Sequence, residues 1–395
     1  MTQSSVRQGH FQTTFIRPLS QEAPNPMNNT VCRWGILSTA DIARKNWLAI
    51  KNSGNAIVVA VASRNVEKAQ KFINDCQSHS PFQQVPTALG SYEELLARTD
   101  IDAVYIPLPT GLRKEWVLRA AAAGKHVLAE KPVGISATDV REMSAACARH
   151  NVQLMDGVMF MHSQRLNALR TALNDGQSVG QLRRISSSFS FAGSDEFVKG
   201  NIRASGELEP AGCVGDLGWY NIRFTLWAMN YQMPTKVSGR LLSQVRRADS
   251  GSPVPTEFSG ELFFDGDVSA SFYCSFLNEN QQWAILSGSK GFIRVPDFVC
   301  PFFGSEVSFD VTNARFAPRG CDFAMEDHTR RVSISEYGNG APNAQETNLF
   351  RNFSQLALSG KPDTVWSDIA LKTQQVMDAC LTSAQHDGKL VELDH

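Results

Sequence analysis

Two residue types that cooperate in proton transfer stand in short, distinctive segments of this chain. Lys131 lies in Glu130-Lys131-Pro132, directly after an apolar run, and Tyr220 ends the segment Gly215-Asp216-Leu217-Gly218-Trp219-Tyr220. A free tyrosine phenol has a pKa of about 10, and a lysine ammonium within ~4 to 6 Å stabilises the phenolate and lowers that pKa. If the fold brings the two together, Tyr220 can exchange a proton with a substrate oxygen while Lys131 tunes its pKa.

Each of these residues also has a plainer interpretation. Lys131 can be a solvated loop lysine, and Tyr220, which has Trp219, Phe224 and Trp227 close by in sequence, can be an aromatic core residue of an amphipathic helix. The position of Lys131 favours the chemical interpretation, because it follows a predicted strand at the carboxyl edge of a parallel sheet, where α/β proteins bind ligands.

The element pattern that must position these residues is of the α/β class. Residues 31–156 alternate short apolar runs with helical patterns, which predicts a doubly wound, parallel, Rossmann-like domain. Strands are expected at 32–37, 57–62, 103–107, 127–129 and 153–155, with helices beginning near Ile42, Val66, Tyr92, Arg113 and Ala137.

The first strand-to-helix turn carries small residues where a dinucleotide fold needs close approach of the backbone. Ser38, Ala40 and Ala43 occupy the three glycine positions of GxGxxG, so N–H groups at the helix N-terminus can approach a pyrophosphate. We expect Ser38, Thr39, Ala40 and Ile42 to contact the cofactor. A tight turn that binds no ligand remains the alternative.

The end of the second predicted strand bears on which dinucleotide is used. An NAD site carries an acidic residue here for the ribose 2′-hydroxyl, but this chain has Ser63-Arg64, about 25 residues after the turn. A hydroxyl and a guanidinium suit a 2′-phosphate, which favours NADP with NAD as the alternative. Arg64 can otherwise be a solvated charge at a strand end.

Residues 157–395 show a different pattern, which predicts a substrate-binding and dimerisation domain of α+β type. Period-two alternation is clearest at 268–276 and predicts an open, mainly antiparallel sheet, with further strands at 184–191, 237–244, 258–264 and 283–288. Residues 295–342 lack a clean period and are expected to form long loops with about two short strands. Helices are expected from Asn343 to Gly360 and from near Ser367, the last one packing back on the first domain.

The composition of the chain indicates which classes of binding partner to expect. Of 395 residues 42% are hydrophobic, and 38 Lys and Arg balance 39 Asp and Glu, so no basic footprint for nucleic acid or an anionic membrane exists. No apolar run reaches the ~18 residues of a membrane span, and residues 1–30 read as a flexible extension without a signal peptide, which predicts a cytoplasmic protein. Eight dispersed cysteines form no metal pattern, so no metal is expected. A small-molecule substrate and a homodimer or higher homo-oligomer through the C-terminal sheet are the predicted partners.

Several segments together resemble one family. Ile106-Pro107-Leu108-Pro109, Glu130-Lys131-Pro132 and the segment from Gly215 to Tyr220 are similar to motifs of the glucose-fructose oxidoreductase, inositol dehydrogenase and rhizopine-catabolism (Gfo/Idh/MocA) family. The likeness is strongest to its dimeric dihydrodiol dehydrogenase, xylose dehydrogenase and anhydrofructose reductase branch. It covers about 31–220 well and extends more loosely to the last helix.

The resemblance implies an NAD(P)-dependent oxidoreductase acting on a sugar or related cyclic polyol or carbonyl. It places Lys131 at the nicotinamide ribose and substrate oxygen, Tyr220 at the proton donor, and Asp216 at an acid that binds substrate or orients the proton relay. The i, i+4 spacing of Asp216 and Tyr220 puts both on one helix face. The same resemblance implies cofactor contacts at Pro107, Leu108, Pro109, Glu130 and Lys131.

Substrate contacts are less well defined, because the family's Asn-Ser-Leu-His turn reads Thr110-Gly111-Leu112-Arg113 and its aromatic-arginine pair is replaced around His162. We take His162, Asn201 and Arg203 as candidates. His162 can equally be a histidine with satisfied hydrogen bonds, and Arg203 a structural ion-pair partner. Two other functions stay open within the resemblance: a non-catalytic NADP-binding regulator, and an NAD-using glycoside hydrolase.

Overall fold

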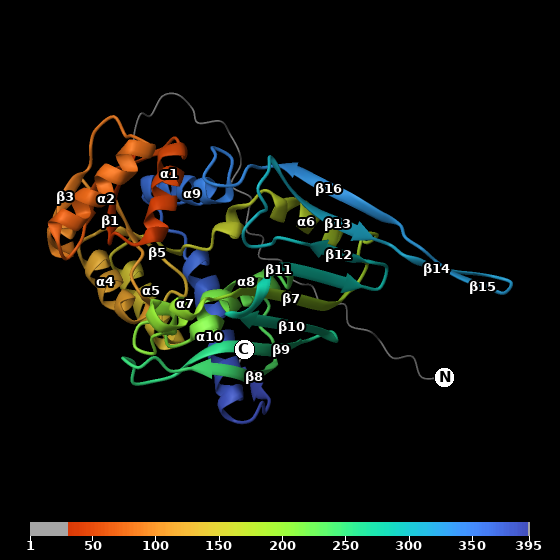
Figure 1. Ribbon diagram of the computed structural model, residues 1–395. Helices are drawn as coiled ribbons and strands as arrows, with labels where there is room; N and C mark the ends of the chain where they lie inside the picture. The colour runs from red at the N-terminus through yellow and green to blue at the C-terminus, as the bar shows by residue number, and fades with distance from the viewer. Residues whose placement is uncertain (1–30, 394–395) are drawn as a thin grey trace.

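The computed structural model describes residues 31–393, and a six-stranded parallel sheet in the order β3-β2-β1-β4-β5-β6 forms its N-terminal half (Figure 1). The strands are β1 (Cys32–Leu37), β2 (Ala56–Ala62), β3 (Thr87–Leu89), β4 (Ala103–Ile106), β5 (His126–Ala129) and β6 (Leu154–Asp156). The helices between them are α1 (Asp41–Asn52), α2 (Val66–His79), α3 (Tyr92–Leu96), α4 (Thr110–Ala122) and α5 (Ala137–Arg149). Since all strand pairs are parallel, the predicted Rossmann-like architecture is confirmed.

Two details of this half differ from the expectation. β3 was not predicted, because it has three residues, of which Thr87 is exposed, and so shows no apolar run. α4 begins at Thr110 and not near Arg113. The extra turn is held from outside the helix, where the Glu209 carboxylate accepts hydrogen bonds from the Thr110 backbone N–H (3.0 Å) and hydroxyl (2.6 Å).

The C-terminal half is built on a nine-stranded mixed sheet in the order β16-β13-β12-β11-β7-β10-β9-β8-β17. Only the β7–β10 pair is parallel. All five strands predicted before Val295 are present: β7 (Leu182–Ala192), β8 (Lys236–Val245), β9 (Val254–Phe264), β10 (Val268–Ser275) and β11 (Leu277–Gly288). β12 (Phe292–Val295) pairs with β11, and β17 (Val391–Glu392) forms one edge of the sheet.

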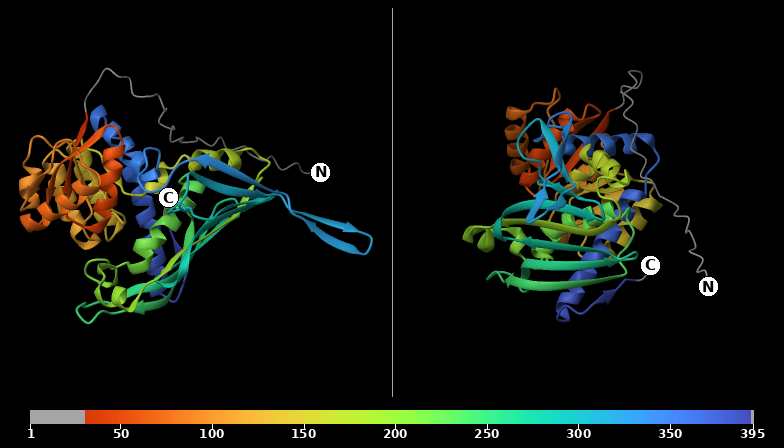
Figure 2. Two further views of the ribbon diagram at one scale, coloured as in Figure 1. Left: turned by 45° about the horizontal axis from the view of Figure 1, so that its top comes forward. Right: turned by 90° about the vertical axis from the view of Figure 1, so that its right-hand side faces the viewer.

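Helices pack on one face of this sheet and leave the other face open (Figure 2). They are α6 (Arg165–Asn174), α8 (Trp219–Ala228) and α10 (Val365–Gln385). Along β9 buried residues alternate with half-buried ones, as expected for a strand covered on one face. Of the shorter helical segments, η1 (Met159–His162) lies between β6 and α6, and α7 (Asp195–Gly200), η2 (Ile202–Ala204) and η3 (Val214–Gly218) lie between β7 and α8.

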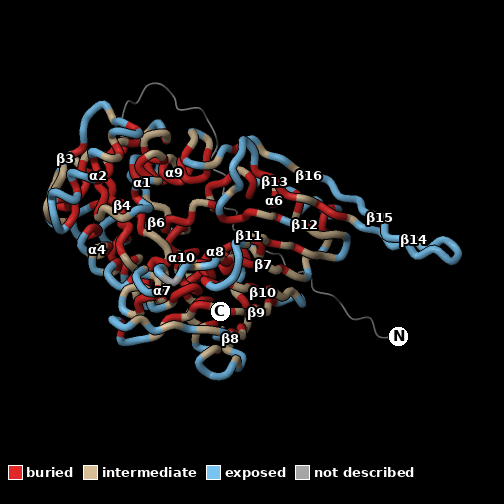
Figure 3. The backbone as a smooth tube through the Cα atoms, in the orientation of Figure 1, coloured by how far each residue is buried: buried red, intermediate tan, exposed pale blue. Residues whose placement is uncertain are grey.

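The prediction of long loops over 295–342 is wrong. Four strands lie there: β13 (Glu306–Thr312), β14 (Arg315–Arg319), β15 (Asp322–Glu326) and β16 (Thr329–Ser335). β14 and β15 form a hairpin that projects away from the N-terminal half and is exposed along its length (Figures 1 and 3). Because most of these residues are exposed, the hairpin lacks the buried periodicity that reveals a strand in sequence.

The two halves share buried contacts. α9 (Gln345–Ser359) returns to the first sheet, where the Trp34 indole N–H donates to the Ser354 hydroxyl (3.1 Å). A fully buried ion pair joins β6 to α8, since Arg223 lies 2.6 Å from the Asp156 carboxylate and neither side chain is exposed. Arg223 also donates to Thr373 in α10 (2.8 Å). Both expected C-terminal helices are present, and no helix within 31–393 is long and apolar enough to cross a bilayer.

Asp156→Asn should lower the free energy of unfolding by about 3 to 5 kcal/mol, because it leaves the Arg223 guanidinium charged and unpaired in the interior. Urea denaturation followed by tryptophan fluorescence measures this. Glu142→Gln is the control, because Glu142 pairs with Lys114 at the surface and its loss should leave the urea midpoint close to that of the parent protein. A loss below about 1 kcal/mol for Asp156→Asn would contradict the structural role of the pair.

Candidate active site

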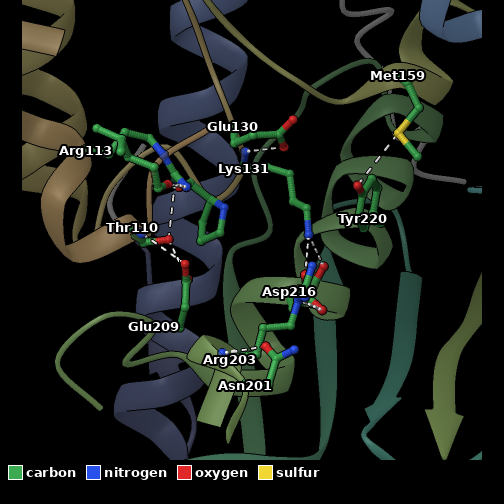
Figure 4. Close-up of polar contacts among 12 residues, drawn as sticks. Thr110, Arg113, Glu130, Lys131, Met159, Asn201, Arg203, Glu209, Asp216 and Tyr220 are labelled. Carbon is green, nitrogen blue, oxygen red and sulfur yellow. Dashed lines mark hydrogen bonds and ion pairs between the residues drawn. The ribbon is translucent and has the colours of Figure 1, made fainter. Parts of the chain in front are cut away.

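The three side chains predicted to carry the chemistry lie together at the carboxyl edge of the parallel sheet (Figure 4). Lys131 follows β5, Asp216 lies in η3, and Tyr220 lies in the first turn of α8. The Lys131 ammonium donates to the Asp216 carboxylate (2.7 Å) and to the Asp216 carbonyl oxygen (2.5 Å). It also lies 4.7 Å from the centre of the Tyr220 ring.

Small residues allow this close approach of loop and helix. A Cβ placed on Gly215 would lie 3.3 Å from the Pro132 side chain and 3.0 Å from the Ala211 Cβ. Gly215 therefore lets the loop that carries Lys131 and Pro132 pack directly against the start of the helix that carries Asp216. The spacing of the two sequence motifs thus has a packing reason as well as a chemical one.

Asp216 is the electrostatic centre of the group. Its side chain is 14% exposed and pairs with two cations, Lys131 at 2.7 Å and the Arg203 Nε at 2.8 Å. Burial alone would raise the pKa of Asp216, but the two positive charges outweigh burial and lower the pKa to about 2. The carboxylate is therefore ionised at neutral pH and holds both cations in place.

The expectation that Lys131 lowers the pKa of Tyr220 is wrong for this arrangement. Burial, with smaller contributions from Glu130, Cys300 and Asp216, raises the pKa of Tyr220 well above its ordinary value. Lys131 faces the ring and is bound to Asp216, while the phenol contacts the Met159 sulfur at 3.7 Å. The phenol is thus protonated at neutral pH, which suits a proton donor.

The turn after β1 has the backbone that a dinucleotide site requires. Ser38, at the first glycine position of the fingerprint, has a φ of 128°, in the region that favours glycine. Its hydroxyl accepts a hydrogen bond from the Ala40 N–H (3.2 Å), and no side chain caps the N-terminus of α1. Thr39 and Ala40 are half-buried and Ile42 is exposed beside this turn. The residues present therefore fit a pyrophosphate bound by backbone N–H groups.

The two residues expected to select the cofactor differ in exposure. Ser63 is buried at the end of β2, with its N–H donating to the Leu89 carbonyl (3.1 Å), while the neighbouring Arg64 is exposed. Among the described side chains no ion-pair partner of Arg64 is found. Tyr92, whose pKa is raised by burial and lowered to a smaller extent by the Arg64 charge, lies near the same corner. A free guanidinium here fits a phosphate group.

Sequence reasoning missed the residues that hold the loops of the site together. Arg113 is fully buried and donates to the carbonyl oxygens of Leu108 (2.5 Å) and Pro132. It thereby joins the Pro107-Leu108-Pro109 loop to the loop of Lys131. The sequence held one signal for this role: the family's usual turn ends in histidine at the position where this chain has Arg113. Glu130 is similarly fixed, because its carboxylate accepts the Tyr105 hydroxyl at 2.5 Å.

The three candidate substrate contacts have different positions. Arg203 is ion-paired with Asp216, and the Asn201 side chain accepts from the Arg203 backbone N–H (3.0 Å), so Asn201 shapes the turn that presents Arg203. His162 does not join them: it is buried, its ring stacks on Trp366 at 4.7 Å, and its Nδ1 lies 3.0 Å from the Asn352 amide. Burial, with Arg223 nearby, lowers its pKa to about 3, so His162 is neutral.

Two models of one family match the chain. The model described as "Oxidoreductase family, NAD-binding Rossmann fold" matches residues 32–158, and the "GFO/IDH/MocA C-terminal domain" model matches residues 167–294. Trans-1,2-dihydrobenzene-1,2-diol dehydrogenase of Mus musculus is 33% identical over 273 residues, which are 68% of this chain and 76% of that protein. A dTDP-3,4-didehydro-2,6-dideoxy-alpha-D-glucose 3-reductase of Actinomadura kijaniata is 27% identical over 365 residues, 91% of this chain and 98% of the relative.

Solved structures share the fold over nearly the whole chain. The 3-ketoreductase KijD10 from Actinomadura kijaniata, in complex with TDP-benzene and NADP, has a TM-score of 0.72 at 24% identity, over 90% of this chain and 98% of its own. An aldose-aldose oxidoreductase from Caulobacter crescentus has a TM-score of 0.74 at 20% identity, over 92% of this chain and 100% of its own. At these identities the likeness shows the fold alone.

Asp216→Asn should lower the free energy of unfolding near neutral pH by about 2 kcal/mol, since the pKa of the carboxyl falls from 3.8 to about 2 on folding. A carboxyl group whose pKa is lowered by folding stabilises the folded state at pH values above its pKa in the unfolded chain. That stabilisation is lost as the pH falls from about 4 towards 2. Urea unfolding of both proteins between pH 3 and 7 should therefore show a difference that shrinks in acid.

Asp378→Asn provides the control for the sign of this effect. Burial raises the pKa of Asp378, so its contribution to stability is largest in acid and is lost as the pH rises. The two variants should therefore show opposite trends with pH. A pH-independent difference for Asp216→Asn would contradict the ion-pair account of the site.

Proposed function

The chain belongs to the GFO/IDH/MocA oxidoreductase family, and from this premise we propose that it transfers a hydride between NADP and a carbon of a sugar or related cyclic carbonyl or polyol. In this proposal Tyr220 gives or takes the proton on the substrate oxygen. The single observation that supports it most strongly is the cluster of Lys131, Asp216 and Tyr220 at the carboxyl edge of the parallel sheet, where α/β folds bind ligands.

Tyr220 is protonated at neutral pH, as the proton donor of a carbonyl reduction must be. When bound, the nicotinamide supplies the hydride. Tyr220 then donates its phenolic proton to the oxygen of the carbonyl that is being reduced, and its raised pKa keeps that proton available throughout the neutral range. In the opposite direction Tyr220 must first lose this proton, which burial makes unfavourable.

Lys131 has the capacity to bind the same oxygen. An ammonium has three N–H donors, and two of them serve the carboxylate and carbonyl oxygens of Asp216. The third is left for a substrate oxygen beside Tyr220. Asp216 thus orients Lys131 and is a positioning residue in this proposal, and Arg203, which shares the carboxylate, supplies a further donor at the half-exposed side of the site.

The cofactor assignment uses residues that directly follow the four central strands of the first sheet, β2, β1, β4 and β5. We propose that the turn Ser38-Thr39-Ala40 with Ile42 holds the pyrophosphate, and that Ser63 and Arg64 bind the 2′-phosphate of NADP. The Pro107-Leu108-Pro109 loop, Glu130 and Lys131 complete the side nearest the nicotinamide. The KijD10 structures contain NADP, which supports the same choice for this chain.

The substrate class follows from the relatives and stays broad. Their names describe a dihydrodiol dehydrogenase, a deoxysugar reductase and an aldose oxidoreductase, which share a cyclic or polyhydroxylated carbon skeleton. We propose a substrate of this kind. We further propose a homo-oligomer that associates through the open face of the nine-stranded sheet.

Tyr220→Phe should lower kcat at least about a thousandfold while the affinity for NADPH stays within about twofold, because the variant loses the proton donor and keeps the ring. Nicotinamide absorbance, followed with a panel of aldoses, keto sugars and trans-dihydrodiols, measures turnover. Since the pKa of Tyr220 lies above 10, the rate of reduction by the parent enzyme should not fall through phenol ionisation below that pH.

The same assay separates the two alternatives. A non-catalytic regulator would bind NADPH and turn over none of the compounds, with no difference between Tyr220→Phe and the parent protein. A glycoside hydrolase that uses NAD transiently would release sugar with no net change in nicotinamide absorbance. Either result would remove the proposed roles of Tyr220 and Lys131.

Arg64→Ala should weaken NADPH binding roughly tenfold to a hundredfold and leave NADH binding nearly unchanged, because the guanidinium contacts only the 2′-phosphate in this proposal. Fluorescence titration of each reduced cofactor provides the dissociation constants. Arg44→Ala is the matched control, since Arg44 lies on α1 but is paired with Asp75 (3.2 Å). Equal losses for NADPH and NADH would contradict the assignment of Arg64.

A further inference from the structure

A chain of three hydrogen-bonded side chains connects the first helix of the N-terminal half to the loop of Lys131. The Asn46 amide, in the second turn of α1, donates to the Tyr105 oxygen (2.6 Å). The Tyr105 hydroxyl, on β4, donates to the Glu130 carboxylate (2.5 Å). Glu130 directly follows β5, so each member of the chain comes from a different element. The hydrogen bonds therefore connect α1, through β4, to the carboxyl end of β5.

The direction of donation along this chain is fixed. An amide N–H can only donate, so the Tyr105 oxygen accepts from Asn46 and its own proton is directed to Glu130. Burial and the nearby Glu130 charge raise the pKa of Tyr105 well above its ordinary value, which keeps this proton on the phenol. Glu130 is therefore held as the acceptor of a permanent hydrogen bond.

Packing holds each member of the chain in place. Tyr105 is fully buried and Asn46 is 5% exposed. Phe350 of α9 packs edge-on against the Tyr105 ring, with the ring centres 5.8 Å apart. The Glu130 carboxylate also packs against the backbone of Gly157, since a Cβ added to Gly157 would lie 3.2 Å from the carboxylate oxygen Oε1. Tyr105 and Gly157 thus both restrict where the carboxylate can lie.

Glu130 itself is only half-buried and borders the candidate active site. Its second carboxylate oxygen lies 3.3 Å from the Lys131 backbone nitrogen, which donates to it (Figure 4). After burial, the Glu130 charge contributes most to raising the pKa of Tyr220, which places the carboxylate within electrostatic reach of that phenol. An ionised carboxylate has about four acceptor positions, and among the described residues Tyr105 and Lys131 provide the donors. The remaining positions are available to donors of a ligand.

We propose that Tyr105 is a positioning residue, which directs the Glu130 carboxylate to accept hydrogen bonds from the nicotinamide riboside end of the cofactor. This inference rests on the proposed function. That end carries ribose hydroxyls and a carboxamide N–H, which are donors that match a free carboxylate oxygen. Glu130 follows β5, whereas Arg64 follows β2, with β1 and β4 between them, so Glu130 lies away from the proposed 2′-phosphate site. Without the Tyr105 hydroxyl the cofactor itself must order the carboxylate, which weakens binding.

Binding of two ligands to Tyr105→Phe separates this role from a general loss of structure. Isothermal titration calorimetry measures the affinity for NADPH and for adenosine 2′,5′-bisphosphate, which has the adenosine and the 2′-phosphate but no nicotinamide riboside. We expect NADPH to bind about fivefold to tenfold more weakly, and adenosine 2′,5′-bisphosphate to bind within about twofold of the parent protein. A merely structural role would weaken binding of both ligands, because Asn46 lies on the helix that begins at the dinucleotide turn.

A double-variant cycle tests whether Tyr105 acts through Glu130. Glu130→Ala should weaken NADPH binding at least as much as Tyr105→Phe does, and combining the two should add less than about twofold. Gly157→Ala disturbs the same carboxylate without altering Tyr105, and it should also weaken binding of NADPH alone. Tyr273→Phe is the matched control, because the Tyr273 hydroxyl also donates to a glutamate, Glu257, but between β10 and β9 of the second sheet. Its affinities should equal those of the parent protein.

The inference is wrong if Tyr105→Phe binds NADPH as the parent does, if it weakens both ligands equally, or if its loss adds in full to that of Glu130→Ala. Should Tyr105→Phe not fold, unchanged NADPH affinity in Gly157→Ala overturns the inference instead. A parent protein that does not bind NADPH would overturn it together with the cofactor assignment.

These measurements do not depend on turnover. A loss of affinity specific to NADPH, in a protein that turns over none of the compounds tested, would keep the role of Tyr105 and overturn the proposed reaction. Turnover by the parent protein, with unchanged NADPH affinity in Tyr105→Phe, would do the reverse.

Discussion

One buried carboxylate, that of Asp216, organises the site. It is the point at which the loop after β5, the segment of Arg203 and the start of the α8 helix meet, because each of the two cations that it binds comes from a different segment. Removing the charges of Asp216 and Lys131 from water is costly, and their pairing with each other and with the half-exposed Arg203 offsets that cost. The pKa of Asp216 is lowered because that pairing stabilises the ionised carboxylate.

The same pairing determines how Tyr220 behaves. Because Asp216 occupies two donors of Lys131, the ammonium is drawn towards the helix and lies over the ring of Tyr220 rather than at its oxygen. The phenol keeps its proton in apolar surroundings formed by Met159 and the neighbouring phenylalanines. A carbonyl oxygen that enters between Lys131 and Tyr220 would meet two donors at once, which is the arrangement that stabilises developing negative charge.

Sequence alone was sufficient for features that depend on local pattern. The parallel sheet, the position of Lys131 after β5 and the helical spacing of Asp216 and Tyr220 each follow from periodicity within a short segment. Features that depend on three-dimensional burial were not accessible. The direction of the Tyr220 pKa shift requires knowing that the ring is buried and that the Lys131 ammonium is bound elsewhere. The exposed β14–β15 hairpin was missed because it has no buried face to produce a pattern.

The most informative departure from sequence reasoning is Arg113. An arginine in this position would ordinarily be placed on the helix surface, yet it is buried and its guanidinium joins the carbonyl oxygens of two loops that both border the site. A guanidinium has five donors in a fixed plane, so one side chain can set the relative position of both loops. Burial lowers its pKa, while Glu209 and Glu130 counteract that effect. The relative position of the two loops that border the candidate site is therefore maintained by Arg113, and substitutions at Arg113 would disturb Lys131 through the backbone of Pro132.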